Sequence, residues 1–205
     1  PVSHADNVTS HVPPNRSPPT SSAVRIPSFS YGGASPRPPG PTVSNNPIQV
    51  SFLSRMKVMV GGTFDPLHAG HRKLLTRSFE LAGAGGCVVI GLTTDEFAGR
   101  KSHPVRPFVE RKRALEGFIR RQEFGSEFRI EPLADRYGPA ADEDFDALVV
   151  SEETLPVGME INRLRQEKGR RKVDIHQISC VLADDGRWIS STRIYRGEID
   201  PEGRL

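Results

Sequence analysis

Two histidines stand three residues apart in the stretch GGTFDPLHAGH, which covers residues 61–71. His68 and His71 follow a double glycine and a proline, and an apolar run at residues 57–60 precedes the glycines. Imidazoles with this spacing lie on one face of a helical turn, and the free N–H groups at a helix start attract anions. The pattern therefore predicts a phosphate-binding site built from a strand, a glycine turn and the beginning of a helix.

The two glycines before the histidines are interpreted as making room for the ligand. Gly61 and Gly62 lack a Cβ atom, so the backbone at the end of the strand could approach a bulky ligand closely. A plain alternative treats the stretch as a tight turn with two incidental surface histidines. Zinc binding is a weaker interpretation, because no third ligand is obvious nearby and both cysteines, Cys87 and Cys180, lie elsewhere.

A second candidate site lies near the end of the chain, where ISST covers residues 189–192. Ser190, Ser191 and Thr192 would place three hydroxyl groups in the first turn of a helix. Ser190 could simply cap that helix. The alternative is a second phosphate-binding turn that faces the first one, to which Arg193 or Arg196 would add positive charge.

The elements that must position these residues alternate along the chain. Short apolar runs predict strands at residues 57–61, 87–93, 128–133, 145–151 and 172–179, and amphipathic stretches predict helices at 71–85, 107–122, 158–169 and 189–199. Five strands alternating with four helices predict an α/β fold, a Rossmann-like, doubly wound, five-stranded parallel sheet. Such sheets bind ligands beyond the carboxyl ends of their strands. GAGG at 83–86 falls at the opposite edge, so we interpret it as a helix stop.

The first 55 residues differ from the rest in composition. They contain eleven of the eighteen prolines, eleven serines and one acidic residue, Asp6. A segment of this kind cannot bury enough apolar surface to offset its ordering entropy. We therefore expect a disordered tail at 1–55, an initiator-like Met56 and one folded domain at 56–205, whose charges balance at 24 basic and 24 acidic residues.

Composition also narrows the partners and the compartment. A neutral domain with scattered tail arginines offers no basic face, so we expect no nucleic-acid partner. No apolar run is long enough to span a membrane, and no signal-peptide pattern opens the chain. Two cysteines in strand-like stretches favour buried thiols in a cytoplasmic protein. The chain has no GxxxxGK[ST] sequence, which excludes a P-loop kinase.

The two candidate sites together resemble the nucleotidyltransferase superfamily, whose signature pairs a T/H-x-G-H motif with a late ISSTRI-like segment, here at 189–194. The block at residues 137–165 is similar to archaeal phosphopantetheine adenylyltransferases and to the matching domain of eukaryotic coenzyme A synthase. The resemblance implies transfer of AMP from ATP to 4′-phosphopantetheine, with Mg²⁺ accompanying the ATP.

The resemblance also implies roles for individual residues. Thr63 would hydrogen-bond the attacking phosphate, and His71 would donate to the α-phosphate with His68 over the phosphate chain. Lys101 would bridge the nucleophile and the α-phosphate, although it could also be a solvated loop lysine. The nucleotide site implied by the resemblance comprises Gly61, Gly62, Thr63, Phe64, His68, His71, Ser190, Ser191, Thr192 and Arg193.

Three alternatives stay open at this stage. A cytidylyltransferase acting on glycerol phosphate or choline phosphate would use the same first motif. A class I aminoacyl-tRNA synthetase shares an H-x-G-H motif, but it needs a KMSKS-type loop and tRNA-binding domains that this chain lacks. A non-catalytic nucleotide-binding module is the third. The residues that hold a pantetheine arm cannot be assigned from the sequence.

Overall fold

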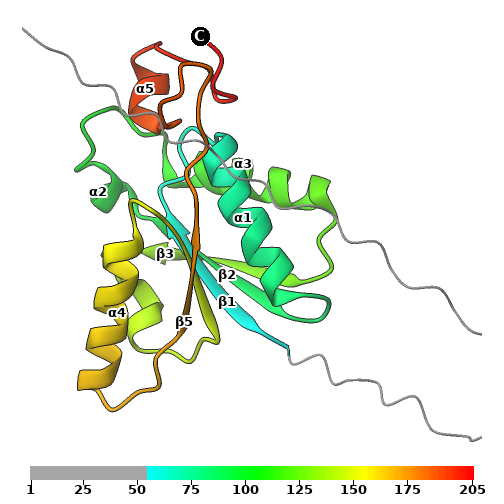
Figure 1. Cartoon of the computed structure of the whole chain (residues 1–205), viewed down its shortest axis with the longest axis vertical. Coiled ribbons are helices and arrows are strands. Elements are labelled where there is room, and N and C mark those ends of the chain that lie inside the picture. Colours follow the sequence, from blue (N-terminus) through cyan, green and yellow to red (C-terminus); the bar gives the residue numbers. More distant parts are fainter. Residues whose placement is uncertain (1–54) are drawn as a thin grey trace, which may run out of the picture. The chain divides into compact units, whose positions relative to one another are not determined.

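A computed structural model describes residues 55–205, so the predicted tail lies outside the described residues except for Arg55. The described part forms one parallel sheet in the order β3-β2-β1-β4-β5 (Figure 1). Its strands are β1 (Lys57–Gly62), β2 (Cys87–Thr93), β3 (Glu127–Leu133), β4 (Ala147–Ser151) and β5 (Asp174–Ile178). The predicted α/β fold with five parallel strands is confirmed.

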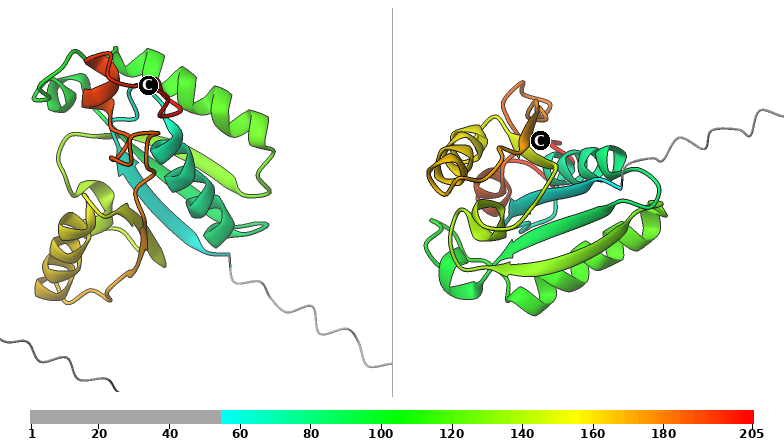
Figure 2. Two further views of the ribbon diagram at one scale, coloured as in Figure 1. Left: turned by 45° about the horizontal axis from the view of Figure 1, so that its top comes forward. Right: turned by 90° about the horizontal axis from the view of Figure 1, so that it is seen from below.

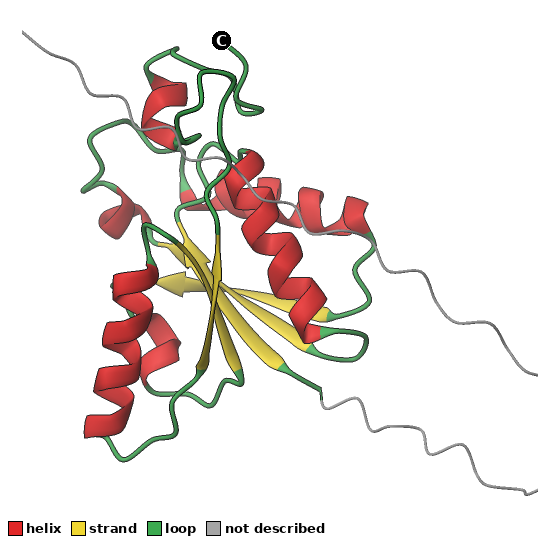
Figure 3. Cartoon of the chain, viewed as in Figure 1, coloured by secondary structure: helices red, strands yellow, loops and turns green. Residues whose placement is uncertain are grey.

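The helices connect the strands in the alternation that the sequence predicts. They are α1 (Ala69–Ala82), α2 (Asp95–Ala98), α3 (Phe108–Gln122), α4 (Leu155–Glu167) and α5 (Ser191–Tyr195), with a 3₁₀ turn η1 (Gly138–Ala141) between β3 and β4 (Figure 3). Helix α2 and the turn η1 were not predicted. Each is a single short turn, and neither has an apolar period long enough to stand out.

Successive side chains along each strand point to opposite faces of the sheet, so the core has two layers. Val58, Val60 and Ile90 point toward α1 and α3, where they pack with Leu75 and Leu115. Their neighbours in sequence point the other way: Met59 and Val89 pack with residues of η1 and α4. The right-hand view of Figure 2 shows β1, β2 and β3 side by side in that order. The sheet is thus covered on both faces, as a doubly wound fold requires.

The order of the strands reverses at β1, whose neighbours are β2 and β4. The first crossover uses α1 on one face, and the return to β4 uses η1 on the other. This is the topological switch point, where the carboxyl end of β1 opens between two diverging connections. The residues GGTFDPLHAGH begin at that place.

Several predicted helix boundaries are wrong; α4, for example, begins at Leu155 and not at residue 158. Helix α1 begins at Ala69 and not at residue 71, because His68 rather than a later residue is its N-cap. The last helix was predicted at 189–199, but α5 ends at Tyr195 and the chain reverses at Gly197, whose φ of 71° is a left-handed conformation. Gly83 caps α1, as predicted for the GAGG stretch.

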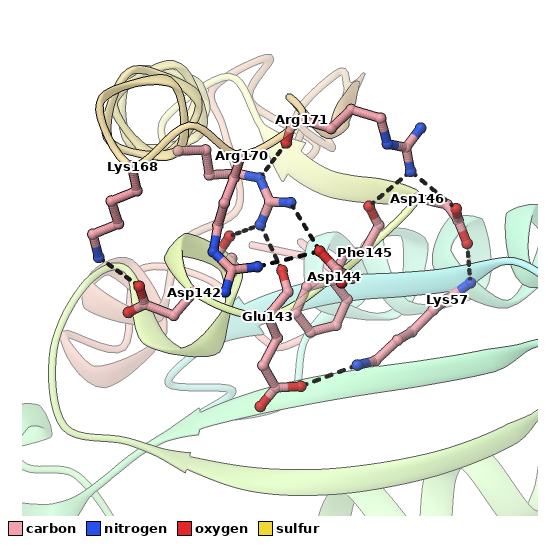
Figure 4. Close-up of polar contacts among 11 residues, drawn as sticks. Lys57, Asp142, Glu143, Asp144, Phe145, Asp146, Lys168, Arg170 and Arg171 are labelled. Carbon is pink, nitrogen blue, oxygen red and sulfur yellow. Dashed lines mark hydrogen bonds and ion pairs between the residues drawn. The ribbon is translucent and has the colours of Figure 1, made fainter.

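A polar network at the amino edge of the sheet fixes the long connection between β3 and β4 (Figure 4). The buried Arg165 of α4 donates hydrogen bonds to the carbonyl oxygens of Ala140 at 2.7 Å, Glu143 at 2.6 Å and Arg171 at 2.7 Å. Glu143 also pairs with Lys57 at the start of β1. The network holds the edge opposite the candidate site, so it supports the fold and not the chemistry.

Candidate active site

The two histidines of the first motif stack on each other at the start of α1. Their ring centroids are 3.7 Å apart with an interplanar angle of 24°. The Nδ1 atom of His68 accepts a hydrogen bond from the backbone N–H of His71 at 3.4 Å, which caps the helix. A Cβ atom on Gly70 would lie 3.1 Å from the His68 ring, so glycine leaves room for the ring over the helix start. The H-A-G-H spacing thus places both imidazoles at the positive end of the helix.

The hydrogen bonds of these rings indicate which nitrogens carry protons. His71 Nδ1 lies 3.2 Å from the carbonyl oxygen of Pro66, and a carbonyl can only accept, so this nitrogen carries the proton. In the neutral ring the Nε2 atom of His71 is then an acceptor. His68 accepts through Nδ1, so its neutral ring carries the proton on Nε2 and can donate from that atom.

Both imidazoles are neutral at physiological pH in the free protein. Burial, and then the nearby Arg72 guanidinium, lower the pKa of His68 from 6.5 to about 4. Burial lowers the pKa of His71 well below 6.5, and repulsion from the His68 ring when it is protonated, and from Lys101 and Arg72, acts in the same direction. A bound phosphate would act in the opposite direction, because an adjacent negative charge favours the imidazolium.

Asp65 lies three residues before His68 in the same motif. It is fully buried and accepts hydrogen bonds from two segments that are distant in sequence. Its Oδ2 atom accepts hydrogen bonds from the backbone N–H of Arg106 at 2.7 Å and from the hydroxyl of Tyr195 at 2.7 Å. Its Oδ1 atom accepts from Nε of Arg106 at 2.5 Å. Burial would raise the pKa of Asp65, but these hydrogen bonds outweigh it and lower the pKa. Asp65 is therefore an ionised anchor that joins the first motif to α5.

A second buried anchor, Arg111 of α3, holds the other side of the same loop. Its guanidinium donates to the carbonyl oxygen of Thr63 at 3.2 Å, the hydroxyl of Thr93 at 3.2 Å and the carboxylate of Asp95 at 2.8 Å. The Arg111 side chain is fully buried, whereas the Asp95 side chain that it reaches is 61% exposed. Arg111 thereby fixes the turn after β1 to the carboxyl end of β2.

A cavity of about 340 Å³ opens at the carboxyl ends of β1 to β4, on the face covered by α4. Its polar lining residues are Thr63, Thr93, Arg100, Lys101, Asp135, Arg136, Tyr137 and Thr154. A larger apolar wall comes from several elements: Met59, Leu133, Leu148, Val150, Val157 and Ile161. A molecule that joins an anionic group to a long, weakly polar body fits this mixed lining.

The hydroxyl cluster near the end of the chain lies against the first motif. Ser190 is the N-cap of α5, and its hydroxyl accepts from the backbone N–H of Arg193 at 3.4 Å. Ile189 and Ile194 pack with Ala69, the first residue of α1. In Figure 1, α5 lies beyond the carboxyl ends of the strands. The two predicted phosphate-binding turns are therefore neighbours.

Comparison with known proteins agrees with this geometry. The Cytidylyltransferase-like family matches residues 59–197. A phosphopantetheine adenylyltransferase from Methanosarcina barkeri is 47% identical over 150 residues, which are 73% of this chain and 92% of that protein. The protein of that name from Methanopyrus kandleri is 49% identical over 148 residues, 70% of this chain and 90% of that protein. The chain belongs to the phosphopantetheine adenylyltransferase family.

A solved structure extends the comparison to three dimensions. A protein described as of unknown function from Archaeoglobus fulgidus superposes with a TM-score of 0.55 and 38% identity. The match covers 60% of this chain and 89% of that one. As a member of the phosphopantetheine adenylyltransferase family, the chain is a nucleotidyltransferase enzyme.

The structure brings most of the predicted site residues to one edge of the sheet. Gly61, Gly62, Thr63 and Lys101 line the same cavity, and Lys101 lies close enough to His71 to affect its pKa. Other side chains occupy part of the space beside the two glycines. A Cβ atom added to Gly61 would lie 3.2 Å from the Leu133 side chain, and one added to Gly62 would lie 3.2 Å from the Phe64 ring. Their role in approaching a ligand stays a prediction.

Two residues of the predicted nucleotide site have other partners in the structure. The Phe64 side chain is fully buried, and its ring centroid lies 5.1 Å from the ring centroid of His71. Phe64 therefore packs against His71 from the side of the core. Arg193 forms ion pairs with Asp185 at 2.6 Å and Glu198 at 3.0 Å. To contact a phosphate, Arg193 would have to exchange one of these partners. Both assignments stay predictions.

Sequence reasoning missed the two anchors, Asp65 and Arg111, and the apolar wall of the cavity. Asp65 stood inside the motif, but nothing nearby in sequence identified its partners. Arg111 did leave a signal: it lies four residues before Leu115 and seven before Phe118, which is the buried stripe of α3. A charged residue on such a stripe needs buried hydrogen-bond partners.

Proposed function

We propose that this chain transfers AMP from ATP to 4′-phosphopantetheine, giving dephospho-coenzyme A and pyrophosphate. The observation that carries the proposal is the mixed lining of the cavity, in which Thr63 and Lys101 share one space with an extensive apolar wall. The printed name of the relatives supports the same reaction.

The cavity favours a long acceptor over a short one. The phosphate of 4′-phosphopantetheine would lie beside Thr63 and Lys101, and its arm would extend along Leu133, Leu148 and Ile161. Glycerol phosphate and choline phosphate are too short to use these apolar walls, which would then face water. For this reason we prefer the adenylyl transfer over a cytidylyltransferase reaction.

The proposed chemistry is a direct displacement at phosphorus. The phosphate oxygen of the acceptor attacks the α-phosphorus of ATP in line, and pyrophosphate leaves from the opposite side. Catalysis of this type depends mainly on positioning and on stabilising charge in the transition state. Arg111 fixes Thr63 and Asp65 fixes the turn before His68, so the binding groups are held before the substrates arrive.

Each of the phosphate-binding groups has a distinct proposed role. His68 donates from Nε2 to the phosphate chain, and His71 donates to the α-phosphate after it takes up a proton. Lys101 neutralises charge between the two substrates. Ser190, Ser191 and Thr192 bind the β- and γ-phosphates from the start of α5.

Magnesium enters the proposal as the ion that accompanies ATP and shields its triphosphate. Within residues 55–205, no group of three or more His, Cys, Asp or Glu side chains could hold a metal ion. No helix of the same residues is long and apolar enough to cross a membrane. We propose a cytoplasmic location on the cysteine usage alone.

A narrowed cavity tests the assignment of the acceptor. Val157 belongs to the apolar wall of the cavity, so Val157→Phe should raise the KM for 4′-phosphopantetheine about tenfold while the KM for ATP changes less than twofold. The matched control is Met159→Phe, on the same helix but largely exposed. Equal changes in the two KM values, or no change in either, would show that the acceptor binds elsewhere.

A further inference from the structure

A second cavity, of about 400 Å³, lies on the other face of the sheet, between the start of α1 and α3. We name it the arginine cleft, because Arg72, Arg106, Arg113 and Arg121 line it together with Gly117 and four uncharged residues. No carboxylate is among its lining residues. A concave surface lined by one sign of charge concentrates counter-ions and binds them.

The four guanidinium groups are only partly neutralised. Arg106 pairs with Asp65 and Arg72 pairs with Glu202 at the borders of the cleft. Within the described part of the chain, Arg113 and Arg121 form no ion pair. Two guanidinium groups without an ion pair among the described residues therefore line one small space.

The helix that forms one wall contains a glycine in its interior. Glycine is unfavourable there relative to alanine, so a reason for Gly117 should be visible. A Cβ atom on Gly117 would meet one atom within 4 Å, Nη1 of Arg121 at 3.4 Å, and no backbone. Close packing therefore does not require this glycine. Its lack of a side chain keeps the wall of the arginine cleft open beneath Arg121.

We propose that the arginine cleft binds a small molecule that carries phosphate groups with at least two negative charges. Guanidinium groups match phosphate oxygens in pairs of parallel hydrogen bonds, and the volume is that of a small-ligand site. The cleft shares no lining residue with the 340 Å³ cavity, so this is a site beyond the proposed reaction.

The cleft is mechanically connected to the first motif. Arg106 binds Asp65 through its backbone and its side chain, and Nη1 of Arg72 donates to the carbonyl oxygen of Leu67 at 3.3 Å. A ligand that draws these guanidinium groups toward itself acts on the turn that positions His68. Occupancy of the arginine cleft would thus change the rate of adenylyl transfer, which makes it a regulatory site.

Calorimetric titration with inorganic tripolyphosphate tests the proposal on the full chain, with the nucleotide site saturated by a non-hydrolysable ATP analogue. We expect binding to persist with the analogue present. The double variant Arg113→Gln/Arg121→Gln should weaken it at least tenfold, and Gly117→Leu, which fills the cleft, should do the same. The control Lys112→Gln/Arg120→Gln removes equal charge from the same helix outside the cleft and should change affinity less than twofold.

The opposing results are equally definite. Loss of tripolyphosphate binding on addition of the ATP analogue would assign the anion to the nucleotide site and overturn the proposal. If both double variants weakened tripolyphosphate binding equally, the binding would reflect general charge attraction and the proposed site would be wrong. The absence of tripolyphosphate binding to the wild type would also contradict the proposal. Adenylyl transfer by Arg113→Gln/Arg121→Gln without added anion should match the wild type, so failure here is distinct from failure of the proposed reaction.

Discussion

The hydroxyl of Tyr195 donates a hydrogen bond of 2.7 Å to the buried carboxylate of Asp65, and so joins two segments that are 130 residues apart in the chain. The same tyrosine ring stacks on His103 with a centroid distance of 4.6 Å. The first and last motifs are thereby connected through one carboxylate. Burial and then this hydrogen bond to Asp65 raise the pKa of Tyr195 to about 12, so the hydroxyl keeps its proton.

Tyr195→Phe tests this connection, because phenylalanine keeps the stacked ring and removes only the donor. A hydrogen bond to a charged group contributes about 1.5–3 kcal/mol, so the free energy of unfolding should fall by roughly that amount. The measurement is urea denaturation at pH 7. The lowered pKa of Asp65 means that this stabilisation is present above its ordinary value of 3.8 and is lost as the pH falls through the lowered pKa. Unchanged stability at pH 7 would show that Asp65 does not need Tyr195.

The two histidines should differ in their effects on turnover. His71→Ala removes a donor to charge that develops at the α-phosphate, so kcat should fall by about 10² or more while ATP affinity changes less. His68→Ala should weaken ATP binding as well as turnover, because its contact exists before the transition state. Steady-state kinetics and direct ATP binding separate the two effects. A near-normal kcat for His71→Ala would refute its assignment.

Protonation of His71 should accompany nucleotide binding. The pKa of His71 is well below 6.5 in the free protein, and the ring can donate from Nε2 only as the imidazolium. At pH 7.5 we therefore expect uptake of about one proton per bound ATP analogue, since the phosphate charge raises the pKa. Calorimetry in two buffers with different ionisation enthalpies measures this uptake, with His71→Asn as the control. Identical apparent enthalpies in the two buffers for the wild type would contradict the proton assignment.

Much of this arrangement follows from the sequence, and the part that does not has a physical reason. The strand, glycine turn and H-A-G-H pattern are local, so His68 and His71 could be placed at the helix start from spacing, whereas Thr63 was assigned from the family resemblance. The ISST stretch could be identified as a helix start, since Ser190 caps α5. Such local patterns do not predict which distant segments come into contact.

Those distant contacts are the ones that the sequence could not supply. Asp65 gains its partners from residues 41 and 130 positions away, and no period in the sequence records them. The apolar wall of the cavity likewise combines Leu133, Leu148 and Ile161 from three elements. From the sequence, each of these residues is indistinguishable from a core residue, because only the folded sheet brings the three together around the cavity.

The expected tail gives another prediction. All proposed site residues lie between Gly61 and Arg193, so a chain that starts at Met56 should keep its melting temperature within a few degrees and retain full adenylyl transfer. Thermal unfolding and steady-state rates of the shortened and full chains provide the comparison. A large loss of activity on shortening would instead assign residues 1–55 a part in the site.

The most direct test of the proposed reaction is product formation by the full chain from ATP and 4′-phosphopantetheine with Mg²⁺. Mass spectrometry of the products should show dephospho-coenzyme A, with one pyrophosphate released for each molecule formed. CTP paired with glycerol phosphate or choline phosphate provides the competing reaction under the same conditions. We predict that the ATP reaction is the faster by at least 10²-fold, about 2.7 kcal/mol in activation free energy; faster release of pyrophosphate from CTP would contradict the proposed function.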